Sequence, residues 1–304
     1  MPDSLQDHGS DRYSRYGQPQ EPWFSRNAEV LFYCALGVAM SLAASWGMGR
    51  ITKRLTPPVS RKSTGQSRAA GSRQIDSGQQ VKAEGLLRRL ASGDSAAADQ
   101  ILRESDSWTG STTRTQTTDQ LIANGINLPD LHLRAAAIQA QLALDGVPRN
   151  TTGFIMLERA TANPSQRAWA LWMLGALGNR GVDADHAAKV IGAYLDDPVV
   201  NNRAAAVNGL ALVATDETIP MMLDRFRNDP SPIVQERAAC GISEAGMYLP
   251  QQRMVAAGTL IGWLDDSLLT SQQKTWTIQA LHDISGKSFG ADAAAWRRWY
   301  DSNR

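Results

Sequence analysis

Histidine and cysteine are the side chains best suited to bind a transition metal, and the 304-residue chain has only four histidines and two cysteines. A zinc site needs several such ligands close together. The histidines have no such neighbour at ligand spacing; they are His8, His132, His186 and His282. Cys34 lies in an apolar stretch and Cys240 in a predicted helix. The sequence therefore predicts no metal site, no disulfide and no cofactor.

The tripeptide Gly286-Lys287-Ser288 is similar to the end of a nucleotide-binding loop. Such a loop has another glycine five residues before the Gly-Lys pair, and it follows a strand. This chain has Leu281 at that position, and the preceding pattern is helical. We therefore exclude a phosphate-binding loop.

Adjacent carboxylates that could act as general acid and base occur at Asp196-Asp197 and Asp265-Asp266. Both pairs stand at predicted helix ends, where a short acidic side chain accepts hydrogen bonds from free backbone N–H groups. The chain also has no Ser-His-Asp spacing and no nucleophile elbow. The sequence predicts no catalysis by this protein.

The elements that position these residues are helices, and the helices repeat. A basic residue opens an Ala-rich apolar segment five times, at intervals of 33, 36, 34 and 37 residues. A period of this size is typical of an α-solenoid, in which each helical hairpin buries its apolar face only against its neighbours. The five residues are Arg134, Arg167, Arg203, Arg237 and Lys274.

Each of these segments follows a predicted partner helix, which gives about five helical hairpins in an all-α solenoid. The partner helices cover residues 115–127, 151–162, 183–195, 216–226 and 250–264. Small residues one and three positions after the basic residue let successive helices approach closely. Glycines near the helix ends predict left-handed caps, and the repeat that ends near Ala214 lacks one. These glycines are Gly146, Gly178, Gly246 and Gly286.

A row of mostly polar side chains lies five positions after the basic residue, on helices whose other faces are apolar. We expect this row to face a concave groove and to bind a protein partner. Trp172 is either a core residue or an exposed anchor, since aromatic side chains in grooves are common binding hot spots. The candidate partner-binding residues are Gln139, Trp172, Asn208 and Gln279, and Ile242 is the fifth member of the row.

These segments resemble HEAT repeats over about residues 115–304. The resemblance rests on residues 170–182 (ALWMLGALGNRGV), 209–220 (GLALVATDETIP) and 229–240 (DPSPIVQERAAC). The chain is similar in particular to bacterial HEAT-repeat proteins that carry an N-terminal membrane segment and end in a Trp-Arg-x-Trp motif, here residues 296–299. The resemblance implies a superhelical binding scaffold without an established activity.

The HEAT pattern also implies a ladder of Asp–Arg pairs, in which a turn Asp stands six residues before the Arg of the second helix. Asp197 and Arg203 keep this spacing. Asp229 stands eight residues before Arg237, and the first repeat departs from the pattern as well. The spacing therefore supports the ladder at one repeat only.

The composition divides the chain into five regions. Residues 81–304, which make up the last two regions, contain 21 basic and 24 acidic side chains and are therefore negatively charged. A nucleic-acid partner is not expected, because it would need a basic surface. In order, the regions are a disordered polar tail (1–27), a transmembrane helix (28–50), a basic flexible linker (51–80), N-terminal capping helices with a loop (81–114), and the HEAT-like repeat domain with a C-terminal capping helix (115–304).

The membrane prediction rests on residues 30–49, which are apolar or small and carry no charge. As a helix, twenty residues span about 30 Å, the thickness of the hydrocarbon core of a bilayer. A cleaved signal peptide is the alternative, with small residues at 41–43. The long preceding region lacks the basic character of a signal peptide, and we therefore favour a single-pass membrane protein.

Basic residues follow this stretch more often than they precede it, with seven between residues 50 and 73 and three before residue 27. The positive-inside rule then places the solenoid in the cytoplasm at the inner membrane, and a solenoid outside is the alternative. Arg50, Lys53 and Arg54 would lie near anionic lipid headgroups, which attract basic residues by about 1 kcal/mol each.

Three functions are compatible with these features. The first is a membrane-anchored scaffold that binds a protein partner and has no catalysis of its own. The second is a HEAT-repeat protein on the envelope or periplasmic side. The third is an enzyme or enzyme accessory, because the helical repeats also resemble those of the phycobilin lyases.

Overall fold

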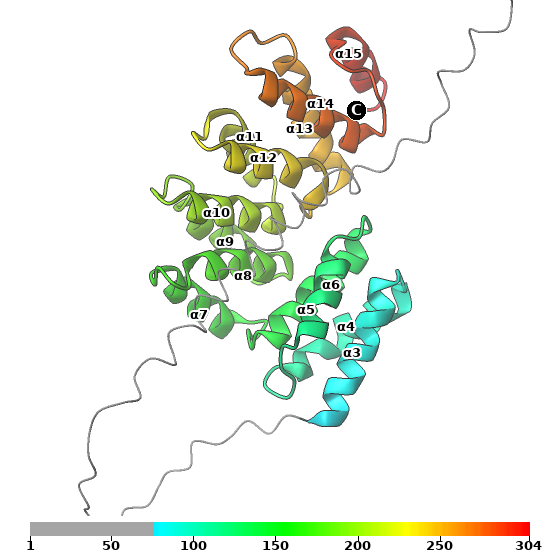
Figure 1. The fold of residues 1–304 in the computed structure, drawn as a ribbon, viewed down its shortest axis with the longest axis vertical. Coiled ribbons are helices and arrows are strands. Elements are labelled where there is room, and N and C mark those ends of the chain that lie inside the picture. The colour runs from blue at the N-terminus through cyan, green and yellow to red at the C-terminus, as the bar shows by residue number, and fades with distance from the viewer. Residues whose placement is uncertain (1–75) are drawn as a thin grey trace, which may run out of the picture. The chain divides into compact units, whose positions relative to one another are not determined.

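A computed structural model describes residues 76–304, and every regular element of this part is a helix (Figure 1). The all-α prediction is therefore confirmed for these residues. In chain order the thirteen α-helices are α3 (Ser77–Ala91), α4 (Ser95–Glu104), α5 (Gln116–Ile126), α6 (Leu131–Leu144), α7 (Thr151–Thr161), α8 (Arg167–Asn179), α9 (Ala184–Gly192), α10 (Val200–Val213), α11 (Thr218–Asn228), α12 (Pro232–Cys240), α13 (Pro250–Trp263), α14 (Ser271–Ser285) and α15 (Ala293–Asp301). A 3₁₀ turn, η1 (Ser105–Trp108), follows α4, and a π-helical turn, η2 (Gly241–Ala245), follows α12.

Helices α5 to α14 form five hairpins, in which the first and second helices alternate as the repeat predicts. Figure 1 shows the hairpins from α7 to α14 stacked in sequence order, with the turns inside the hairpins along one edge, on the left. We call this edge the turn edge. Helices α3 and α4 precede the five hairpins, and within residues 76–304 no helix is both long and apolar enough to cross a bilayer. The predicted membrane span, the tail before it and the basic residues Arg50, Lys53 and Arg54 lie outside the described residues.

Three of the second helices, α6, α8 and α10, are buried over most of their residues. Each residue of α6 from Leu133 to Leu144 is buried. The closest approach joins α8 and α10, where a Cβ atom added to Gly175 would lie 2.3 Å from the carbonyl oxygen of Gly209. Only glycine fits this contact, because real Cβ atoms do not approach other atoms so closely. Small residues thus set the spacing of α8 and α10, but at other positions than the first and third after the basic residue, where the sequence predicts the contact.

The predicted left-handed caps are confirmed at two positions and wrong at two. Gly146 and Gly286 have φ angles of +73° and +67°. Gly178 instead lies inside α8, which ends at Asn179, and Gly246 has an extended backbone with φ −82°. Ala214, where glycine is missing, nevertheless adopts the left-handed conformation with φ +51°.

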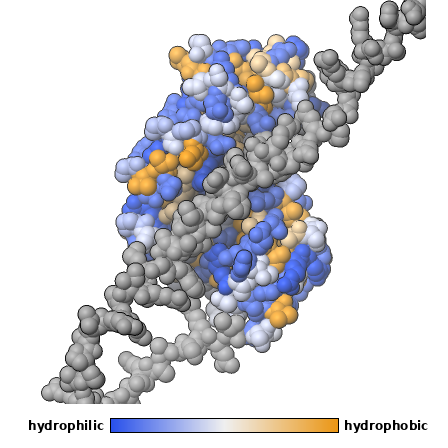
Figure 2. Space-filling model, in the orientation of Figure 1, coloured by the Kyte–Doolittle hydropathy of each residue, from blue (hydrophilic) through white to orange (hydrophobic). Residues whose placement is uncertain are grey.

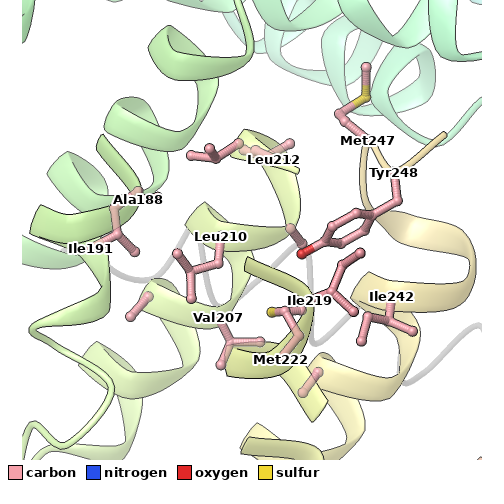
Figure 3. Close-up of a cluster of buried hydrophobic side chains, with 14 of the residues drawn as sticks. Ala188, Ile191, Val207, Leu210, Leu212, Ile219, Met222, Ile242, Met247 and Tyr248 are labelled. Carbon is pink, nitrogen blue, oxygen red and sulfur yellow. The ribbon is translucent and has the colours of Figure 1, made fainter. Parts of the chain in front are cut away.

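The buried apolar side chains form two clusters. One runs from Ala83 to Leu144 and lies among α3, α4, η1, α5 and α6. Its Trp108 is fully buried, although the sequence predicts only a loop over residues 105–118. The other runs from Ala135 to Trp296, and Figure 3 shows its centre, where side chains of α9, α10, α11 and η2 meet. Helix α6 contributes to both clusters.

The end of the array is covered by α15. Trp296 is fully buried, and its indole N–H donates to the carbonyl oxygen of Gly290 at 2.9 Å. Phe289 and Trp299 each contact the Trp296 ring edge-on. The aromatic residues therefore close the apolar face of the last hairpin, as their spacing predicts.

We expect Gly175→Ala to destabilise the protein by about 3 kcal/mol, because the added methyl group must push the α8 and α10 backbones apart. Gly262→Ala is the matched control: it lies in α13, and its added Cβ atom would meet nothing within 4 Å. This change should stabilise the protein by about 0.5–1 kcal/mol through helix propensity. Urea unfolding followed by circular dichroism measures both changes, and equal effects of the two would show that the glycine contact is not required.

Candidate partner-binding surface

The four predicted binding residues differ in burial: Gln139 is buried, and the other three are half-buried. Gln139 is buried on α6, and its Nε2 donates to the carbonyl oxygen of Leu102 at 2.9 Å and to Ser105 Oγ at 3.0 Å. Its Oε1 accepts a hydrogen bond from Arg180 Nε at 3.3 Å. The amide is therefore fully engaged inside the protein, and Gln139 does not line a groove. The cause is η1, which covers the face of α6 that the sequence suggests is open.

Trp172, Asn208 and Gln279 are half-buried. Trp172 packs against the larger apolar cluster. Gln279 donates from Nε2 to Asp283 Oδ1 at 2.8 Å, within α14. The role of these three side chains in binding stays a prediction.

Two arginines at the start of second helices, Arg167 and Arg203, each connect their hairpin to the next one. Arg203 donates to both carboxylate oxygens of Asp229, at 2.8 and 3.0 Å, and to the carbonyl oxygen of Asp197 at 3.0 Å. In the preceding hairpin Arg167 donates to Asp197 Oδ2 at 3.1 Å and to the carbonyl oxygen of Thr161 at 2.9 Å. Each arginine thus binds the carbonyl six residues before it and the aspartate of the following hairpin. The Asp–Arg ladder therefore covers two junctions, one more than its spacing in the sequence supports.

This hydrogen-bond pattern corrects the repeat alignment at α12. Gln235 Nε2 donates to the carbonyl oxygen of Asp229, again six residues earlier, at 2.6 Å. Gln235 is therefore the structural equivalent of Arg203, and Arg237 is not. The sequence comparison fails here because it selects the nearest basic residue, two positions beyond the true equivalent.

A second set of ion pairs runs beside the ladder. Arg225 Nη1 lies 2.8 Å from Asp196 Oδ1, which joins α11 to the turn of the preceding hairpin. Arg227 Nη2 lies 2.5 Å from Asp266 Oδ2 of the following hairpin. Arg297 of α15 pairs with Asp265. The adjacent Asp pairs thus hold neighbouring repeats together, which agrees with a structural rather than a catalytic role.

Exposed aliphatic side chains recur on the turn edge. Val199, Ile233 and Leu268 belong to the turns or helix starts of three consecutive hairpins, and they are 52%, 53% and 83% exposed. Figure 2 shows separate apolar patches within a mostly hydrophilic surface on the left-hand side of the described part. Sequence periodicity does not detect these residues because they lie outside the apolar faces of the helices. The sequence feature that could have indicated two of these exposed residues is a proline directly before each, Pro198 before Val199 and Pro232 before Ile233.

A cluster of charges lies at η2 and the neighbouring helix α14. Burial raises the pKa of Glu244, and the nearby carboxylate of Asp283 raises it further. Arg134 and Arg253 act in the opposite direction without cancelling the increase. His282 Nδ1 lies 3.2 Å from Asp283 Oδ1. The cluster joins side chains of α6, η2, α13 and α14.

In the part of the chain that the structure describes, no group of three or more His, Cys, Asp or Glu side chains could hold a metal ion.

Comparison with known proteins identifies one family. Residues 155–243 match the model of HEAT repeats. The matched segment runs from α7 into η2 and contains both rungs of the ladder. Together with the helical fold, the match shows HEAT-type repeats over residues 155–243, and HEAT repeats are generally protein-interaction scaffolds. No curated protein matches the sequence.

Arg203→Ala should destabilise the protein by about 3 kcal/mol, because it leaves the buried carboxylate of Asp229 without its countercharge. Arg237→Ala should cost less than about 1 kcal/mol, since Arg237 is not part of the ladder. Denaturant unfolding measures both. The corrected repeat alignment is refuted if the Arg237 variant loses as much stability as the Arg203 variant.

Glu244→Gln should raise the stability at neutral pH. Because the folded-state pKa of Glu244 lies above its unfolded value, folding favours the protonated carboxyl, and this contribution is lost as pH rises through the folded pKa. Glutamine does not ionise, so the variant does not lose this stability as pH rises. Melting temperatures should therefore differ at pH 7 and converge near pH 4, and a constant difference over this range would contradict the expectation.

Proposed function

We propose that the protein is a scaffold that binds another protein through the turn edge of its HEAT-like hairpins and performs no catalysis itself. The observation that supports this proposal is the repeated exposure of Val199, Ile233 and Leu268 at the same edge of three consecutive hairpins. Isolated exposed aliphatic residues are normal on a protein surface. Recurrence in successive repeats gives a row with the period of the array, which an elongated partner can follow.

The size of this row limits what it contributes to binding. Complete burial of an aliphatic side chain gives about 1.5–3 kcal/mol, and two of the three are already half covered. The row therefore supplies on the order of 4 kcal/mol, less than a stable complex needs. Further contacts are required, and we assign them to the half-buried Trp172, Asn208 and Gln279, as the sequence predicts.

We also propose that residues 28–50 anchor the protein in the inner membrane by a single span, with the repeat domain in the cytoplasm. The support is the uncharged stretch 30–49 and the excess of basic residues after it. Arg50, Lys53 and Arg54 would then contact anionic headgroups. Reporter fusions on the two sides of residues 30–49 test the orientation, and a reporter active outside after residue 75 would favour the envelope-side alternative.

The binding proposal is tested by crosslinking in intact membranes. A triple variant with Val199→Ser, Ile233→Ser and Leu268→Ser should lose the crosslinked partner that the unmodified protein gives, and Trp172→Ala should weaken the crosslink. Val255→Ser is the matched control, because Val255 is a 61% exposed aliphatic residue of α13 outside the row. A partner that survives the triple variant, or that the control abolishes equally, would exclude the turn edge as the binding surface.

A further inference from the structure

The junction between α6 and α8 differs from the next ones in the array. The smaller apolar cluster holds the α3–α6 segment, and the larger one holds α7 to α15. Helix α6 contributes three buried apolar residues to the larger cluster, Ala135, Ile138 and Leu142, and the partly buried Leu131 packs against it. The two segments therefore have largely separate cores that meet along one face of α6.

This junction also lacks a rung of the Asp–Arg ladder. Arg134 is the first arginine of the series, and it donates from Nε and Nη2 to the carbonyl oxygen of Leu128, six residues earlier, at 3.1 and 2.7 Å. The following hairpin has Thr161 where the next two have Asp197 and Asp229. Arg134 therefore has no carboxylate to bind in its neighbour.

Arg134 instead reaches a segment that is more than a hundred residues away in the chain. Its Nη1 donates to the carbonyl oxygen of Glu244 at 2.9 Å and to that of Gly246 at 2.8 Å. Arg134 is only 3% exposed. Burial, together with the nearby Arg253, lowers its pKa to about 10, so the guanidinium stays charged at neutral pH.

The loop after η2, whose Glu244 and Gly246 carbonyl groups accept these hydrogen bonds, has a tightly turned backbone. The π-helical turn η2 is followed by Gly246, where an added Cβ atom would lie 2.2 Å from the carbonyl oxygen of Gly241. The next residue, Met247, is buried and donates from its backbone nitrogen to the carbonyl oxygen of Ala211 at 2.8 Å. The loop is therefore fixed to the larger segment, and Arg134 connects it to the smaller one.

Arg253 holds the same loop from within the larger segment. Its Nε donates to the carbonyl oxygen of Tyr248 at 2.9 Å, and its Nη1 donates to that of Ser243 at 2.6 Å. Two arginines thus bind the carbonyls at the end of one helical turn, where positive charge is favourable. Of these two arginines, Arg134 is the one that joins the two segments, and Arg180 of the larger segment also donates to Gln139 of α6 at 3.3 Å.

We propose that Arg134 is the latch of a two-state joint: it closes the α3–α6 segment onto the loop after η2, and its release lets the two segments separate along the α6–α8 interface. The shared face of α6 is small, and the ladder rung that fixes the next two junctions is absent. The hydrogen bonds of Arg134 to the loop after η2 are therefore the charged contact that stabilises the closed arrangement. This inference does not depend on the proposed partner binding.

The latch is tested by a distance measurement in the full-length protein. Spin labels on Ser95→Cys of α4 and Ser271→Cys of α14, both exposed, report on the two segments after Cys34→Ser and Cys240→Ser. With Arg134 present, one distance is expected. Arg134→Ala should add a second, different distance, because loss of hydrogen bonds from a charged group shifts an equilibrium on the order of 10- to 100-fold.

Arg253→Ala is the matched control. It should increase amide hydrogen exchange in residues 243–248 and leave the single distance unchanged, because it loosens the loop without releasing the latch. Arg134→Lys retains the charge and should give a smaller population of the second distance. The proposal is wrong if both Arg134 variants keep a single distance, or if Arg253→Ala gives the same second distance. It is also wrong if both Arg134 variants lose amide protection equally in α3 and α14, because the two segments would then form one cooperative unit.

Discussion

Buried guanidinium groups at the start of the second helices must find partners for their N–H groups inside the protein, because an unpaired buried charge is costly. Arg167 and Arg203 meet this requirement in the same way, with a carbonyl of their own turn and a carboxylate of the next hairpin. Since the arginine is fixed at both ends, the following hairpin has one position available to it. The close backbone contact between α8 and α10 can form only in that position.

The period of the repeats, the places of the partner helices and the all-α fold could be predicted from the sequence because they depend on the spacing of apolar and small residues. The predictions that were wrong concern details that depend on tertiary hydrogen bonds. Gln235 takes the place of an arginine because a side-chain amide also reaches the carbonyl six residues earlier. Gln139 is buried because η1 folds over α6, and the polar composition of residues 105–114 does not indicate this.

The candidate surface was predictable only in part. The row that contains Trp172 and Asn208 lies on helices whose remaining faces are buried, and both side chains are half-exposed as a result. The exposed aliphatic residues of the turn edge follow no helical period, since they belong to the connections between helices. Their regularity comes from the stacking of the hairpins, which becomes visible only when neighbouring repeats are placed together.

The uneven junctions have a mechanical consequence. Where a ladder rung and a glycine contact act together, as between α8 and α10, the array resists both bending and sliding. Where the rung is absent, as at α6, the junction lacks this restraint. If Arg134 releases as we propose, a force applied across residues 76–304 would be taken up there as rotation of two intact segments, before any hairpin is stretched. A scaffold of this kind can adjust the distance between its two ends without loss of secondary structure.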